Sequence, residues 1–158
     1  MAIHLLTTRF NNATWNENVE FREKYNYVGC IYNSPRLMPP KVKPDETVYI
    51  IEMNNTLNKI EGIGSIKNNP VLNKYYKIHI DNNYNRFSFQ SHTRLDRTEI
   101  DVAIIEVLEQ LCFKGKTHVK RGQGFMSISK KAIEINNTPY ITEMVHQVFI
   151  NRRNNYDC

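Results

Sequence analysis

Apolar and polar residues follow two different spacings along this chain, and these spacings separate strand-like from helix-like segments. Residues 47–53, TVYIIEM, are apolar on both faces and rich in β-branched and aromatic side chains, which is typical of a buried strand. A polar turn at 54–58 and a second run at 59–67, KIEGIGSIK, complete a predicted hairpin. Gly62 and Gly64 in that run indicate a bulge or a close backbone approach.

Shorter apolar runs predict further strands on both sides of this hairpin. Residues 4–9 and 28–33 have the composition of short strands. In residues 76–80, alternate positions are apolar, and a polar turn follows at 81–85. Residues 87–89 contain two phenylalanines and would form the returning strand, so we expect a second hairpin over residues 76–89. The chain therefore predicts five or six strands.

The two ends of the chain each carry a helical pattern. A helix over residues 12–25 would begin at an asparagine cap and bury Trp15 and Val19 on one side. A C-terminal helix over 139–152 follows Thr138 as its N-cap, with proline at its first position. Its predicted apolar face consists of Ile141, Met144, Val145 and Val148.

A third helix is predicted after the strands. Asp96 and Glu99 have the spacing of a capping box, and Gly115 is a helix-terminating residue. Its apolar stripe is formed by Ile100, Ile104, Val107, Leu108 and Leu111. We therefore expect one α+β domain over residues 1–158, a small twisted β-sheet or β-barrel of five to six strands flanked by about three helices.

The charge of the chain is concentrated in one segment. The net charge is +5 and the pI is about 9.1. Residues 114–131, KGKTHVKRGQGFMSISKK, here called the basic segment, contain no carboxylate, and Gly122 and Gly124 permit a tight turn that presents backbone N–H groups. The predicted phosphate-binding residues are Lys114, Lys116, His118, Lys120, Arg121, Lys130 and Lys131. The alternative is a solvated basic loop that follows a helix.

The aromatic content, nine Tyr, seven Phe and one Trp, suggests a pocket in which an unpaired base stacks. Amide and hydroxyl groups next to aromatic rings would read the edge of such a base. The predicted base pocket consists of Trp15, Tyr32, Asn33, Ser34, Asn54 and Asn55. For each ring alone, packing in the core is the competing interpretation.

No catalytic or metal-binding pattern stands out. The five histidines have no metal-ligand spacing, and Cys30 and Cys112 lie in apolar segments, which favours buried thiols in a reducing compartment. Glu52, inside the best strand, is either exposed at an edge or buried with a partner. We expect no catalytic residue, no metal and no cofactor, and the enzyme question stays open with non-catalytic binding favoured.

The chain also lacks a signal peptide and an apolar run that could span a membrane. We therefore expect an intracellular protein, in the cytoplasm or the nucleus, with no membrane partner. The excess of Asn, Ile, Lys and Tyr is typical of an AT-rich genome, such as that of a large DNA virus, so the cell could be an infected host.

Residues 28–68 resemble the PUA-like superfamily, particularly its EVE and YTH branches. The shared features are a strand that ends in small polar residues (31–34), an apolar strand that follows Asp45, a turn, and a glycine-containing strand (60–66). Tyr32 stands where YTH domains have a tryptophan. The resemblance implies a compact β-barrel flanked by helices that binds RNA or DNA, often at a modified or extruded base.

Three hypotheses about function follow. The first is a non-catalytic nucleic-acid-binding domain, in which the basic segment contacts phosphates and an aromatic pocket holds a modified or extruded base. The second is a small nucleic-acid-processing or nucleotide-modifying enzyme that uses Glu52, Lys59 or His118. The third is a structural or virion-associated protein whose basic face packages nucleic acid without preference for any base.

Overall fold

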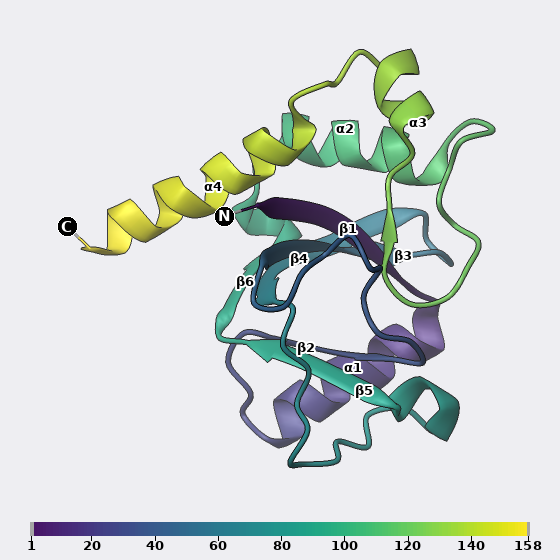
Figure 1. Cartoon of the computed structure of the whole chain (residues 1–158), viewed down its shortest axis with the longest axis vertical. Coiled ribbons are helices and arrows are strands. Elements are labelled where there is room, and N and C mark those ends of the chain that lie inside the picture. Colours follow the sequence, from purple (N-terminus) through teal and green to yellow (C-terminus); the bar gives the residue numbers. More distant parts are fainter. Residues whose placement is uncertain (1, 158) are drawn as a thin grey trace.

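The central element is a mixed five-stranded sheet. A computed structural model describes residues 2–157, with side chains described for residues 2–153 (Figure 1). In spatial order, the strands of the central sheet are β6 (Thr93–Asp96), β4 (Lys59–Lys67), β3 (Thr47–Asn54), β1 (Ile3–Phe10) and β7 (Met126–Ser127). β1 and β3 are parallel, and the other neighbouring strands are antiparallel. A separate two-stranded sheet pairs β2 (Cys30–Ser34) with β5 (Phe87–Ser91).

Different elements cover the two faces of the central sheet. On one face lie α2 (Val102–Phe113), α3 (Lys130–Ile135) and α4 (Ile141–Asp157). On the other face lie α1 (Asn12–Lys24) and the β2–β5 sheet (Figure 1). Successive side chains of β3 point to opposite faces of the central sheet, so β3 contributes to two hydrophobic cores, one on each face. Tyr49 and Ile51 pack toward the helices, whereas Val48 and Ile50 pack toward the two-stranded sheet.

The class α+β is confirmed, but the strands do not form a closed barrel. The described residues form seven strands in two sheets, with four α-helices and two short 3₁₀ turns, η1 (Asn82–Asn85) and η2 (Arg97–Glu99). The predicted hairpin of 47–67 is present, with a register shift at Glu52 and Met53.

The glycine prediction is confirmed at both positions of that hairpin. Gly62 lies opposite Glu52 at the register shift, and a Cβ there would meet the carbonyl oxygen of Leu95 at 2.6 Å. A Cβ on Gly64 would lie 2.2 Å from the hydroxyl oxygen of Tyr32. Both are sites of close approach that only glycine accommodates without movement.

The predicted hairpin of residues 76–89 is wrong. Residues 76–80 form no strand, and β5 pairs with β2, more than fifty residues earlier in the chain. Asn85 explains the irregular path, because its buried side chain accepts hydrogen bonds from the backbone N–H groups of Ile78 and His79 and donates to the carbonyl of His79. A side chain that binds backbone in this way competes with strand pairing.

Two helix predictions need correction in detail. Asp96 and Glu99 do form a capping box, but it caps only the single turn η2, and Asp101 caps the helix that begins at Val102. In α1 the residue with the deepest burial is Asn18, whereas Trp15 and Val19 are only half-buried. No helix in the described part of the chain is long and apolar enough to cross a membrane.

Candidate nucleic-acid interface

The basic segment is a loop held down at three apolar positions. Val119, Phe125 and Ile128 are buried, and the backbone N–H of Val119 donates to the carbonyl of Cys112 at 3.0 Å. These anchors bury the apolar side chains and leave the charged ones outside. The exposed cations of the segment are Lys114, Lys116, Arg121, Lys130 and Lys131, and His118 and Lys120 are half-buried.

The structure divides these cations between two places. Lys114 to Arg121 lie in the loop between α2 and β7, whereas Lys130 and Lys131 belong to α3 in the helical layer. His118 is tied to the loop itself, because its Nδ1 accepts from the backbone N–H of Lys120. The part of the segment around Lys120 and Gly122–Gly124 adjoins a pocket.

This pocket, here called the loop pocket, has a volume of about 210 Å³ and lies where β1 ends. One wall is formed by residues 8–11 and Thr14, at the end of β1 and the start of α1. The roof is formed by Lys120 and residues 122–124 of the basic segment. The residues that complete the lining are Asn33, Pro35, Asn55, His79 and Tyr84. No carboxylate is among the lining residues, so the pocket favours a polar or anionic ligand.

Arg9 supplies the inner charge of the loop pocket. Its Nη1 donates to Thr7 Oγ1 at 2.9 Å, and its Nη2 donates to the carbonyl of Gly124. Burial lowers the pKa of Arg9 to about 10. The guanidinium is still charged at neutral pH, and it ties the β1 strand to the basic segment.

Tyr84 and His79 form the aromatic side of the loop pocket. Their rings meet edge to face with centroids 6.2 Å apart, and His79 is buried with its Nδ1 2.7 Å from Glu17 Oε1. Tyr84 is half-buried, so part of its ring is open to a ligand. Neither residue was part of the predicted base pocket.

Two of the six predicted base-pocket residues, Asn33 and Asn55, line the loop pocket. Asn33 is largely taken up by protein contacts, because its Nδ2 donates to the carbonyl of Tyr76 and its Oδ1 accepts from Ser88. Asn55 donates from Nδ2 to the carbonyl of Lys120 at 2.8 Å. The Asn55 amide therefore joins the predicted base pocket to the basic segment.

Tyr32 is not a stacking surface, which corrects the prediction. It is only 1% exposed, and its ring packs edge-on against Phe125 with centroids 6.4 Å apart. Burial raises the pKa of Tyr32 well above its ordinary value. The ring belongs to the core because the distant Phe125 covers it.

Three further predicted residues also turn away from the loop pocket. Asn54 is 1% exposed, donates to Glu61 and Asn12, and accepts from two backbone N–H groups. Ser34 is buried and bonds to the backbone of Arg36. Trp15 is half-buried against Phe10, so it lies beside the pocket wall and does not line it.

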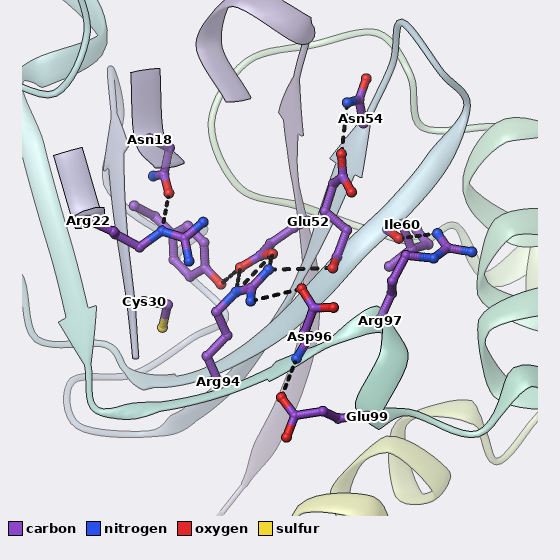
Figure 2. Close-up of polar contacts among 12 residues, drawn as sticks. Asn18, Arg22, Cys30, Glu52, Asn54, Ile60, Arg94, Asp96, Arg97 and Glu99 are labelled. Atoms are coloured by element: carbon purple, nitrogen blue, oxygen red, sulfur yellow. Dashed lines mark hydrogen bonds and ion pairs between the residues drawn. The ribbon is translucent and has the colours of Figure 1, made fainter. Parts of the chain in front are cut away.

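Glu52 is buried with partners, which settles the choice left open by the sequence. Figure 2 shows its carboxylate facing Arg94, whose Nε and Nη2 donate at 2.9 and 2.6 Å, and Tyr32 donates its hydroxyl at 2.6 Å. Burial alone would lower the pKa of Arg94, but the hydrogen bonds and charge of Glu52 raise it. This cluster joins β2, β3 and β6 in the interior.

The three residues of the enzyme hypothesis are engaged in separate contacts. Glu52 is 1% exposed, Lys59 pairs with Glu61 at 3.4 Å, and His118 binds the backbone of its own loop. Among the side chains that the structure describes (residues 2–153), no group of three or more His, Cys, Asp or Glu residues lies close enough together to hold a metal ion. Burial raises the pKa of both Cys30 and Cys112 to about 12, so these thiols are poor nucleophiles.

A larger open groove, of about 1090 Å³, lies at the opposite end of β3 and β4. It runs between α4, the β5–β6 turn and residues 69–73, and its lining includes Lys67 and Arg153. Glu99 also lines it and pairs with Arg152. The lining is mainly cationic, with Lys67, Arg94, Arg152 and Arg153 against the one carboxylate of Glu99, but it contains no residue of the basic segment, so the loop pocket is the candidate site that the basic segment shares.

Sequence reasoning missed Arg9, His79 and Tyr84. Arg9 had one usable signal, because a charged residue between Thr8 and Phe10 in a strand needs an acceptor or a ligand. The other two lie in a segment whose path depends on Asn85, so no local pattern could have placed them.

Comparison with known proteins gives no relative from which a function could be inferred. No family model, no curated protein and no solved structure matches this chain.

Proposed function

We propose that this chain is a non-catalytic nucleic-acid-binding domain whose basic segment contacts phosphates and whose loop pocket holds one unpaired or extruded nucleotide. The observation that carries the proposal is the position of Lys120 and residues 122–124. They belong to the basic segment and also form the roof of a polar pocket without a carboxylate. A strand whose phosphates follow the exposed Lys116 and Arg121 would pass the mouth of this pocket.

The dimensions and lining of the pocket support a nucleotide. A pocket of about 210 Å³ admits a single base, and the half-buried Tyr84 offers an aromatic surface. Stacking of a base on such a ring contributes about 1–3 kcal/mol. The resemblance of residues 28–68 to the PUA-like superfamily agrees with binding at an extruded base.

The phosphate contacts are tested by the salt dependence of binding. Removing one phosphate contact should flatten the slope of log K against log salt by about 0.7 for a single strand. We expect Lys116→Ala and Arg121→Ala each to weaken binding and flatten the slope, because both side chains are exposed in the basic segment. Fluorescence titration of a labelled 12-mer at several salt concentrations measures this.

Lys24→Ala is the matched control. Lys24 is an exposed lysine at the far end of α1, and its replacement changes the net charge by the same amount. An effect of Lys24→Ala equal to that of Lys116→Ala would mean that net charge alone matters. Unchanged slopes in all three variants would refute the proposed phosphate contacts.

The pocket is tested by comparing single strands with matched duplex. Extruding a base from a duplex costs a few kcal/mol, so single strands should bind more tightly. Tyr84→Ala should weaken single-strand binding about 5- to 150-fold and leave the salt slope intact, since stacking releases no counterions. Equal affinity for duplex and single strand would favour the packaging hypothesis.

A further inference from the structure

A cationic pocket is usually taken for a phosphate site, but the hydrogen bonds of the loop pocket argue for a base edge. The amide of Asn55 is fixed in one orientation. Its Nδ2 donates to the carbonyl of Lys120 at 2.8 Å, and a carbonyl oxygen only accepts. Oδ1 is therefore the acceptor on the other side, and it is buried without a partner among the described residues.

Arg9 is fixed in the same way, and one of its buried nitrogens, Nε, has no hydrogen-bond partner among the described residues. Its two terminal nitrogens are occupied, Nη1 by Thr7 Oγ1 and by the carbonyl of Val119, and Nη2 by the carbonyl of Gly124. The end-on grip of a phosphate through both terminal nitrogens is thus blocked, because Nη1 and Nη2 are already bound to the protein.

The loop pocket is therefore lined by one residue with an unpaired acceptor and one with an unpaired donor. An unpaired buried group costs about 1–3 kcal/mol, and a ligand that pairs with it recovers this cost. A phosphate at neutral pH offers acceptors and would repel the Oδ1 of Asn55. The Watson–Crick edge of a nucleobase offers an N–H donor beside an acceptor, which matches both groups.

We infer that Asn55 and Arg9 read the Watson–Crick edge of an unpaired nucleobase, with Asn55 Oδ1 accepting an N–H and Arg9 Nε–H donating to its neighbour. The inference rests on the proposed function and adds the ligand edge and the residues that read it. Both atoms are covered, so the base reaches them when the exposed residues Gly122 and Gln123 of the turn shift while Gly124 stays bound to Arg9. Both glycines have positive φ, 111° and 72°, and Gly122 is exposed.

The test uses strands whose Watson–Crick edge is blocked by one methyl group. Labelled 12-mers of thymine and adenine are compared with the same strands carrying N3-methylthymine or N1-methyladenine, at one salt concentration. Discrimination through such a contact is about 1–3 kcal/mol, so methylation should weaken the tighter-binding strand about 5- to 150-fold. Thymine and N3-methylthymine are both neutral and the number of phosphates is unchanged, so a phosphate site would not respond to the thymine pair, which is therefore the deciding comparison.

Variants of Asn55 assign the discrimination to this residue. Asn55→Ala should bind the plain and methylated strands equally, because it lacks the acceptor. Asn55→Asp keeps an acceptor and should keep the preference for the plain strand, although its added charge and the lost N–H bond to the Lys120 carbonyl weaken both affinities. Far-UV circular dichroism and thermal melting establish that each variant is folded.

The outcomes separate the two claims. Tight but equal binding of plain and methylated strands by the wild-type protein would overturn the base-edge inference and leave the proposed function standing. A preference that persists unchanged in Asn55→Ala would assign the reading to other residues and also overturn it. Failure of the folded wild-type protein to bind any of the four strands would overturn the proposed function itself.

Discussion

Gly64→Ala should be strongly destabilising, because Gly64 is the point where β4 passes closest to the side chains of β2. An added Cβ would lie 2.2 Å from the hydroxyl oxygen of Tyr32 and 2.7 Å from Cys30 Sγ. Neither neighbour has room to retreat, since Tyr32 is 1% exposed and Cys30 is 1% exposed. The hydroxyl also donates to Glu52 at 2.6 Å, so moving the ring breaks that bond.

The magnitude follows from three terms. Overpacking a closed core costs about 1–3 kcal/mol. Loss of a hydrogen bond to a charged group costs about 1.5–3 kcal/mol. Replacing a strand glycine by alanine returns about 0.5–1 kcal/mol of conformational free energy. We therefore expect Gly64→Ala to lower the free energy of unfolding by roughly 2–5 kcal/mol, measured by urea denaturation.

Gly115→Ala is the matched control for this prediction. A Cβ there meets nothing within 4 Å, and only its φ of 77° opposes the substitution. That backbone cost is about 1–2 kcal/mol. The double variant Gly64→Ala with Tyr32→Phe lacks the clashing hydroxyl. Its free energy of unfolding should therefore be at least about 1 kcal/mol higher than the value obtained by adding the effects of the two single variants. Strict additivity, or a Gly64→Ala protein as stable as the wild type, would refute the argument.

Two further predictions concern the interior. Glu52→Gln should lower the free energy of unfolding, measured by urea denaturation, by about 3–5 kcal/mol. The reason is that Arg94 would then be a buried charge without its Glu52 counterion. A decrease below about 1 kcal/mol would contradict this pairing. Burial raises the pKa of Cys30 and Cys112 from 9.0 to about 12, so the unfolded chain loses these protons first as pH rises. The free energy of unfolding should therefore fall from about pH 9 upward, and it should fall less steeply in the double variant Cys30→Ala, Cys112→Ala. Identical pH slopes in the wild type and the double variant would show that these thiols do not cause the fall.

The local elements of this fold were predictable, because their patterns lie within a few residues of one another. The 47–67 hairpin is indicated by β-branched residues, a polar turn and two glycines. The pairing of β5 with β2 was not predictable in the same way. The alternation at 76–80 is also typical of a strand, but in the structure the side chain of Asn85 binds the backbone N–H groups of Ile78 and His79, which competes with pairing to another strand.

The candidate site was predicted in part, for a related reason. Asn54 and Asn55 are neighbours with the same side chain, yet one is enclosed by protein hydrogen bonds and the other lines the loop pocket. Successive residues at the end of a strand point to opposite sides, and the sequence does not say which side is covered. Tyr32 was misplaced because Phe125, over ninety residues later, covers its ring.

Hydrogen–deuterium exchange, measured with and without a saturating single-stranded 12-mer, tests most directly whether the loop pocket and the basic segment form the nucleic-acid interface. The account predicts that protection on binding appears in residues 116–124, at the end of β1 and around Asn55 and Tyr84. The groove lined by residues 69–73 and α4 should exchange as it does in the free protein. Protection confined to that groove, or absent from residues 116–124 in a protein that binds the strand, would contradict the account.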